Sequence, residues 1–127
     1  MPEVVVSITG ASGAQYAERL LRALSDANWD ILLIVTNAGA INLNLELSMT
    51  PTDLANIPGV SLEDNGNLAA RSASGSAKID YYVICPASGT TISKLAAGIS
   101  DNLVTRSALV ALKERRPLIV VPRESPY

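Results

Sequence analysis

Histidine is absent from this 127-residue sequence, and cysteine occurs once, as Cys85. A single cysteine excludes a disulfide within the chain and fits a reducing cytoplasm, which is the location we expect. Without histidine, one chain cannot assemble a Ser-His-Asp or Cys-His catalytic group, and a zinc site is disfavoured. Because Cys85 ends a predicted buried strand, we expect a core thiol rather than a nucleophile, and no metal in the site.

Charged residues and long apolar runs are also scarce. Charged residues make up 17% of the chain and the net charge is −2, so no basic surface for a nucleic acid or a membrane is expected. No apolar run approaches the roughly 20 residues of a membrane span, and the first residues do not resemble a secretion signal. Apolar residues nevertheless reach 48% and the mean hydropathy is +0.25, which predicts surface buried against other subunits.

Short apolar segments alternate with helical patterns along most of the chain. The segment 30–36 is apolar almost throughout, which is typical of a strand buried on both faces of a parallel sheet. The alternation predicts one α/β domain over residues 1–127, a sandwich with a doubly wound, mostly parallel sheet. The predicted strands are 3–8, 30–36, 81–85 and 118–121, and the predicted helices are 14–27, 38–45, 90–97 and 101–113.

The helix starts and the segment 48–70 carry weaker signals. Asn37 and Asp101 are the predicted N-caps of the helices that follow them. Prolines and glycines interrupt 48–70, so only one helical turn, starting near Thr52 or Asp53, is predicted there.

The sequence TGASG at residues 9–13 joins the first predicted strand directly to the first predicted helix. Such a junction forms an anion site because backbone N–H groups and the helix dipole point at the turn. Gly10 and Gly13 allow a sharp turn and close approach of a ligand, and Ser12 adds a hydroxyl. The alternative is a glycine turn that only connects strand to helix.

In doubly wound sheets, ligands bind beyond the carboxyl ends of the strands. Thr36 ends a predicted strand, Ser88 and Thr91 follow one, and all three either hydrogen-bond a ligand or cap helices. NAD is disfavoured because the loop reads GxxG and no acidic residue ends the second strand. A single phosphate with a polyhydroxyl tail, as in FMN, fits better. After the last strand, Arg123 is suited to phosphate and Glu124 to acid or base chemistry.

Two other charged features each allow two interpretations. Glu46 stands alone in an apolar and amide-rich stretch, as either an exposed helix-end acid or a functional carboxylate. Lys113 begins the run KERR, which by itself is typical of a solvated helix end that complements the dipole.

Several longer segments resemble the flavin prenyltransferase family of the UbiX/Pad type. The resemblance covers nearly the whole chain and is weakest at 48–70. Its most specific segment is DNLVTRSALVALKERRPLIVVPRESP. The other matching segments are TGASGAQYAERLL (9–21), IVTNA (34–38), ASGS (73–76) and ICPAS (84–88).

The resemblance implies a flavodoxin-like, Rossmann-like three-layer subunit that attaches a dimethylallyl group from dimethylallyl monophosphate to reduced FMN, at N5 and then at C6. The product, prenylated FMN, would serve a UbiD-type decarboxylase. The catalytic residues implied are Ser12, Glu46 and Glu124. Those implied for FMN are Gly10, Ala11, Ser12, Gly13, Thr36, Ser88, Thr91 and Arg106, and those for the substrate phosphate are Ser74, Lys113 and Arg123.

The resemblance also implies a homo-oligomer built from trimers, up to a dodecamer, with FMN at subunit contacts. Family chains continue past the RESP motif with a Tyr and an Arg that complete the phosphate site, whereas this sequence ends at Tyr127. We therefore expect the last strand to need a cover from elsewhere. The alternative to an active enzyme is an FMN-binding carrier or scaffold impaired by loss of that tail.

Overall fold

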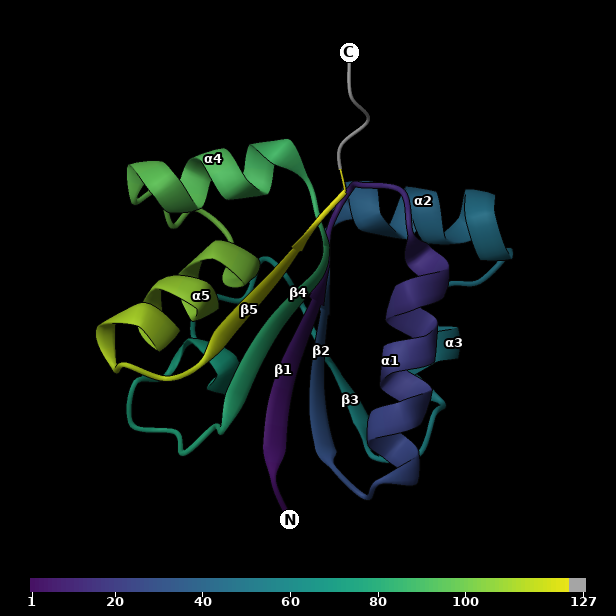
Figure 1. Cartoon of the computed structure of the whole chain (residues 1–127), viewed down its shortest axis with the longest axis horizontal. Coiled ribbons are helices and arrows are strands. Elements are labelled where there is room, and N and C mark those ends of the chain that lie inside the picture. The colour runs from purple at the N-terminus through teal and green to yellow at the C-terminus, as the bar shows by residue number, and fades with distance from the viewer. Residues whose placement is uncertain (124–127) are drawn as a thin grey trace.

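The computed structural model describes residues 1–123 and has one parallel sheet with helices on both sides (Figure 1). The strand order is β3-β2-β1-β4-β5, and every neighbouring pair is parallel. The strands are β1 (Glu3–Ile8), β2 (Asp30–Val35), β3 (Val60–Glu63), β4 (Tyr81–Ala87) and β5 (Leu118–Pro122). The predicted doubly wound fold is confirmed, and the sheet is wholly rather than mostly parallel.

Two apolar cores lie on the two faces of the sheet. The helices are α1 (Ala14–Asp26), α2 (Asn37–Leu47), α3 (Pro51–Ala55), α4 (Gly89–Ala97) and α5 (Leu103–Lys113), with a 3₁₀ turn at Arg71–Ala73. Helices α1, α2 and α3 pack on one face, and α4 and α5 cover the other (Figure 1). Alternate residues of β1 explain this division, since Val4 and Val6 enter one core while Val5 enters the other. None of the helices in residues 1–123 is long and apolar enough to cross a membrane.

The segment 48–70 contains more structure than its sequence predicts. A capping box at Thr50 precedes α3, which begins at Pro51, so the expected start at Thr52 or Asp53 is one or two residues late. The strand β3 was not predicted at all. It is an edge strand of four residues, and Ser61 and Leu62 at its centre are exposed, so it lacks the apolar run that marks the buried strands.

Several boundaries also differ from the prediction. Thr36, not Asn37, caps α2, because its hydroxyl accepts the Gly39 N–H at 2.9 Å. Asn102, not Asp101, caps α5 in a reciprocal box with Thr105. The strand β4 continues through the cis Cys85–Pro86 peptide to Ala87 instead of ending at Cys85, with a register irregularity after Ile84.

The face of β4 and β5 on the α1 side is partly open among the described residues. Ile119 of β5 is 50% exposed and Tyr81 of β4 is 41% exposed. Together with Leu20 and Leu24 of α1 they line a shallow apolar groove of about 250 Å³.

Candidate functional site

The carboxyl ends of all five strands meet at one edge of the sheet because the strands are parallel. The strand order reverses between β1 and β4, and a crevice at such a reversal is the usual ligand position in open α/β sheets. The loop 9–13 follows β1 at this position, and Ser88 follows β4. We call the loops at this end the ligand edge.

Thr9 joins the two sides of the reversal. Its buried hydroxyl donates to the Pro86 carbonyl at 2.7 Å and accepts the Ser88 N–H at 2.8 Å. Its own N–H also donates to Pro86, at 3.2 Å. Thr9 therefore fixes the spacing of the two loops that border the crevice. Its role was not predicted, although a threonine directly after a buried strand was the available signal.

Replacing Thr9 with valine should lower the free energy of unfolding by about 1–3 kcal/mol, because the shape is kept while the Ser88 N–H loses its acceptor. Urea unfolding followed by circular dichroism measures this change. Thr90→Val is the matched control on exposed α4 surface and should stay within about 0.5 kcal/mol of the parent chain. Equal stabilities of the Thr9 and Thr90 variants would contradict the bridging role.

The glycine loop binds an anion that belongs to the chain itself. Gly13 has φ of 115°, a left-handed conformation that favours glycine. The Glu46 carboxylate, near the end of α2, accepts the Gly13 N–H at 3.1 Å and the Ala14 N–H at 3.0 Å. Both bonds go to Oε1, and Oε2 also accepts the Gly13 N–H at 3.3 Å, so the carboxylate ties α2 to the start of α1. Glu46 thus lies at the loop with Ser12, whose side chain is exposed there.

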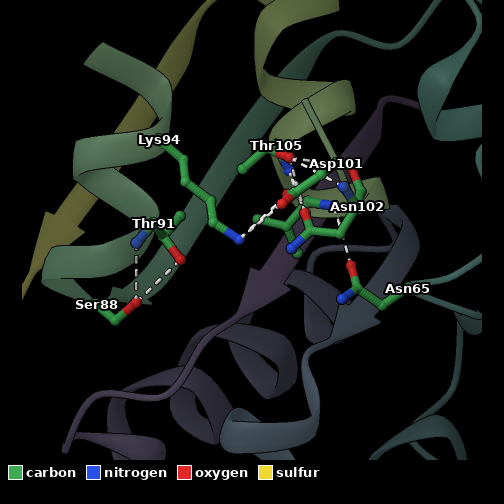
Figure 2. A network of polar contacts seen from close by, with 8 residues as sticks. Asn65, Ser88, Thr91, Lys94, Asp101, Asn102 and Thr105 are labelled. Atoms are coloured by element: carbon green, nitrogen blue, oxygen red, sulfur yellow. Dashed lines mark hydrogen bonds and ion pairs between the residues drawn. The ribbon is translucent and has the colours of Figure 1, made fainter. Parts of the chain in front are cut away.

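The predicted hydroxyl residues lie at two helix starts on the ligand edge. Ser88 caps α4 by accepting the Thr91 N–H at 3.2 Å, and the two hydroxyl oxygens are 3.0 Å apart (Figure 2). Thr36 caps α2. The capping interpretation therefore holds for Thr36 and Ser88, and it leaves each hydroxyl with further hydrogen-bonding capacity for a ligand.

Arg123 extends from the end of β5 toward the glycine loop. Its N–H donates to the Ala87 carbonyl at 3.3 Å, and its guanidinium carbon lies 5.3 Å from the centre of the Tyr16 ring. Its Nε would be 3.4 Å from a Cβ built on Gly13. The predicted Arg123 and Glu46 thus approach the same glycine. Glu124 lies outside the described residues.

The start of α5 brings Arg106 to the same end of the molecule. Asn65 fixes this start, since its side-chain oxygen accepts the Val104 N–H and its carbonyl accepts the Leu103 N–H (Figure 2). The Arg106 Nε is buried and has no hydrogen-bond partner among the described residues. A cleft of about 610 Å³ opens nearby, between the ends of β2 and β3 and the α5 start. Its lining includes Thr36, Asn37, Asp64, Asn65, Asp101 and Asn102.

Ser74 and Lys113 lie near the amino ends of the strands, at the opposite end of the sheet from the ligand edge. Lys113 ends α5 just before β5 begins, whereas Arg123 follows its end (Figure 1). A strand rises about 3.3 Å per residue, which puts the two ends of β5 on the order of 15 Å apart. Ser74 lies beside this turn because the neighbouring Gly75 carbonyl accepts from Arg116 at 2.8 Å. One chain does not bring Ser74 and Lys113 together with Arg123.

Cys85 is a buried free thiol in the core beneath the site. Burial raises the pKa of the Cys85 thiol above its ordinary value, so the unreactive protonated form persists. This environment agrees with the predicted core role.

A glycine loop and hydroxyl-capped helices around a β1–β4 reversal define a flavodoxin-like α/β binding protein. The model of the family described as Flavoprotein matches residues 1–125. Among curated relatives, the flavin prenyltransferase UbiX of Thermoplasma acidophilum is 46% identical over 97% of this chain and 67% of its own. The corresponding Deinococcus radiodurans protein is 40% identical over 98% of this chain and 64% of its own length.

Two solved structures agree with this relationship. The crystal structure of AnUbiX in complex with FMN and dimethylallyl pyrophosphate superposes with a TM-score of 0.94, at 31% identity over 99% of this chain and 66% of that one. A dodecameric FMN-dependent UbiX-like decarboxylase from Escherichia coli superposes with a TM-score of 0.93, at 34% identity over 98% of this chain and 68% of that one. The chain belongs to the flavoprotein family and, within it, to the flavin prenyltransferases of the UbiX type. The predicted resemblance is confirmed, and the chain spans about two thirds of the length of these relatives.

Proposed function

We propose that this chain binds FMN and transfers a dimethylallyl group from dimethylallyl monophosphate to the reduced flavin. The new bonds would form at N5 and then C6, inorganic phosphate would leave, and the product would pass to a UbiD-type decarboxylase. The observation that carries the proposal is the approach of Glu46 and Arg123 to Gly13 of the glycine loop. An allylic phosphate needs a cation for its departing charge and nearby groups that handle protons.

The residues of the ligand edge fit a flavin monophosphate. The α1 start is already occupied by Glu46, which favours the hydroxyl-capped starts of α2 and α4 for the FMN phosphate and ribityl chain. The buried Nε of Arg106 lacks an acceptor among residues 1–123, and a flavin carbonyl would supply one. These contacts involve Thr36, Ser88, Thr91 and Arg106, four of the eight residues expected to hold FMN.

Within this site the chain's own side chains have distinct tasks. Ser12 is exposed on the loop and would lie near the reacting flavin nitrogen. Arg123 would bind the phosphate of the prenyl donor through its planar N–H groups. Glu46 holds the loop through two backbone N–H groups and, with Glu124, would supply the carboxylates for proton transfer.

A second copy of the chain would supply the remaining phosphate ligands. Lys113 lies at the other end of β5 from Arg123, so we expect the two to contact one phosphate when they come from different copies. The same holds for Ser74, which lies at the same end of the sheet as Lys113. A homo-oligomer that joins the two edges resolves this separation, and the E. coli neighbour is dodecameric.

Mixing two inactive variants tests the shared site. Glu46→Ala and Lys113→Ala should each abolish prenyl transfer alone. Mixed, unfolded and refolded together at equal amounts, they should recover about a quarter of wild-type activity, because random assembly leaves that fraction of sites with both residues intact. Mixing each variant with itself is the control. No recovery, in oligomers shown to contain both chains, would contradict a shared site.

The activity itself is tested by the mass of the flavin. Reduced FMN and dimethylallyl monophosphate are incubated with the protein without oxygen, and the flavin should become heavier by one C5H8 unit. Bound FMN of unchanged mass would instead support the carrier or scaffold alternative. Failure to bind FMN would contradict both functions.

A further inference from the structure

Tyr16 is an exposed aromatic residue at the ligand edge to which the proposed function assigns no task. It lies in the first turn of α1, 51% exposed, where the amphipathic pattern of α1 does not require an aromatic ring. Its N–H donates to the Gly13 carbonyl at 3.0 Å, which ties its backbone to the glycine loop. Its side chain contacts Arg123 across that loop.

Tyr16 and Arg123 pack against the same face of Gly13. A Cβ on Gly13 would be 3.1 Å from the Tyr16 Cδ2 and 3.4 Å from the Arg123 Nε. The guanidinium carbon is 5.3 Å from the ring centre, within the range of a cation–π contact. Among residues 1–123, no carboxylate forms an ion pair with Arg123. Among residues 1–123, the Tyr16 ring is therefore the group that holds the Arg123 guanidinium.

We propose that Tyr16 is a positioning residue that holds the Arg123 guanidinium over the glycine loop, ready for the phosphate of the prenyl donor. The inference rests on the proposed function for the identity of the anion. A ring attracts a guanidinium through its face and leaves the in-plane N–H donors free. A carboxylate partner would occupy those donors and neutralise the charge that the phosphate needs. An aromatic ring can thus orient Arg123 without competing with the substrate.

The contact itself is tested on the 127-residue chain by NMR of the Arg123 Nε–H group, which Arg123→Lys identifies by removing its signal. Tyr16→Leu should shift this resonance by removing the ring current, whereas Tyr16→Phe should leave it near its wild-type position. An unchanged resonance in Tyr16→Leu would overturn the proposal whatever the protein's function is.

The consequence for binding is measured by calorimetry on the FMN-loaded chain, titrated with dimethylallyl monophosphate. Tyr16→Leu should bind it about two- to fivefold more weakly, as expected for an exposed cation–π contact, and Tyr16→Phe should bind it like wild type. FMN affinity should not change. An equal loss of FMN affinity in Tyr16→Leu would mean that the ring contacts the flavin, and would overturn the proposal. Failure of the wild-type chain to bind the prenyl phosphate would contradict the proposed function, while the NMR result would still decide whether Tyr16 holds Arg123.

Discussion

Replacing Glu46 with alanine should lower the rate of flavin prenylation by about a hundredfold or more, the usual cost of losing a catalytic acid or base. The variant also removes the acceptor of the Gly13 and Ala14 N–H groups. Single-turnover assays with reduced FMN and dimethylallyl monophosphate, read by flavin mass, measure the rate. Urea unfolding in parallel measures how much of the loss reflects a loosened loop.

Glu46→Gln separates the two tasks of this side chain. The two shortest hydrogen bonds of Glu46 use Oε1, at 3.1 Å from the Gly13 nitrogen and 3.0 Å from the Ala14 nitrogen, while Oε2 lies 3.3 Å from the Gly13 nitrogen. A glutamine can place its amide oxygen at the same position, so loop geometry and stability should stay close to wild type. Its activity should nevertheless fall nearly as far as in Glu46→Ala, because an amide does not transfer the proton. Near wild-type activity in Glu46→Gln would show that Glu46 only holds the loop.

Gly39→Ala should lower the free energy of unfolding by about 1–3 kcal/mol, the usual cost of overpacking a tight contact. A Cβ at Gly39 would lie 2.6 Å from the Ile8 carbonyl oxygen and 3.1 Å from the Thr36 hydroxyl. Alanine is the better helix former by about 1 kcal/mol. The close contact outweighs that gain because the Ile8 oxygen belongs to the backbone of a central strand and cannot move aside.

The same substitution should weaken FMN binding by at least about tenfold, equivalent to roughly 1.4 kcal/mol. To relieve the contact, α2 must move away from the end of β1, and Thr36 moves with it. Fluorescence titration with FMN measures the affinity. Gly98→Ala is the control: Gly98 has φ of 71° and open space around its Cβ position, so it costs backbone strain without a clash. Wild-type FMN affinity in Gly39→Ala would show that α2 does not form part of the flavin site.

Most of the sheet could be predicted from the sequence because its central strands are buried on both faces. Such strands must be apolar throughout, and β2 has that pattern in Ile31–Val35. The edge strand β3 exposes both of its central residues, so its four residues mix polar and apolar character. Helix caps were displaced by one residue at Thr36 and Asn102 because adjacent Thr, Asn and Asp residues cap comparably well.

The candidate site was predicted as a set of residues but not as an arrangement. Chain order indicates that Ser12, Thr36, Ser88 and Arg123 follow strands and therefore share an edge. It does not indicate that Glu46 turns back from the end of α2 to bind the Gly13 N–H, because that contact depends on how α2 packs beside α1. Tyr16 and Thr9 were missed for a similar reason, since their partners Arg123 and Ser88 are distant in sequence.

The sequence by itself determined the fold class, the glycine loop and the family, because these depend on local periodicity and on motifs of contiguous residues. Only the tertiary structure decided which candidates meet. It placed Glu46 and Arg123 at one glycine and Ser74 and Lys113 at the far edge. The direction of β5 is the physical reason, since a strand places the residues that precede it and those that follow it at opposite ends of the sheet.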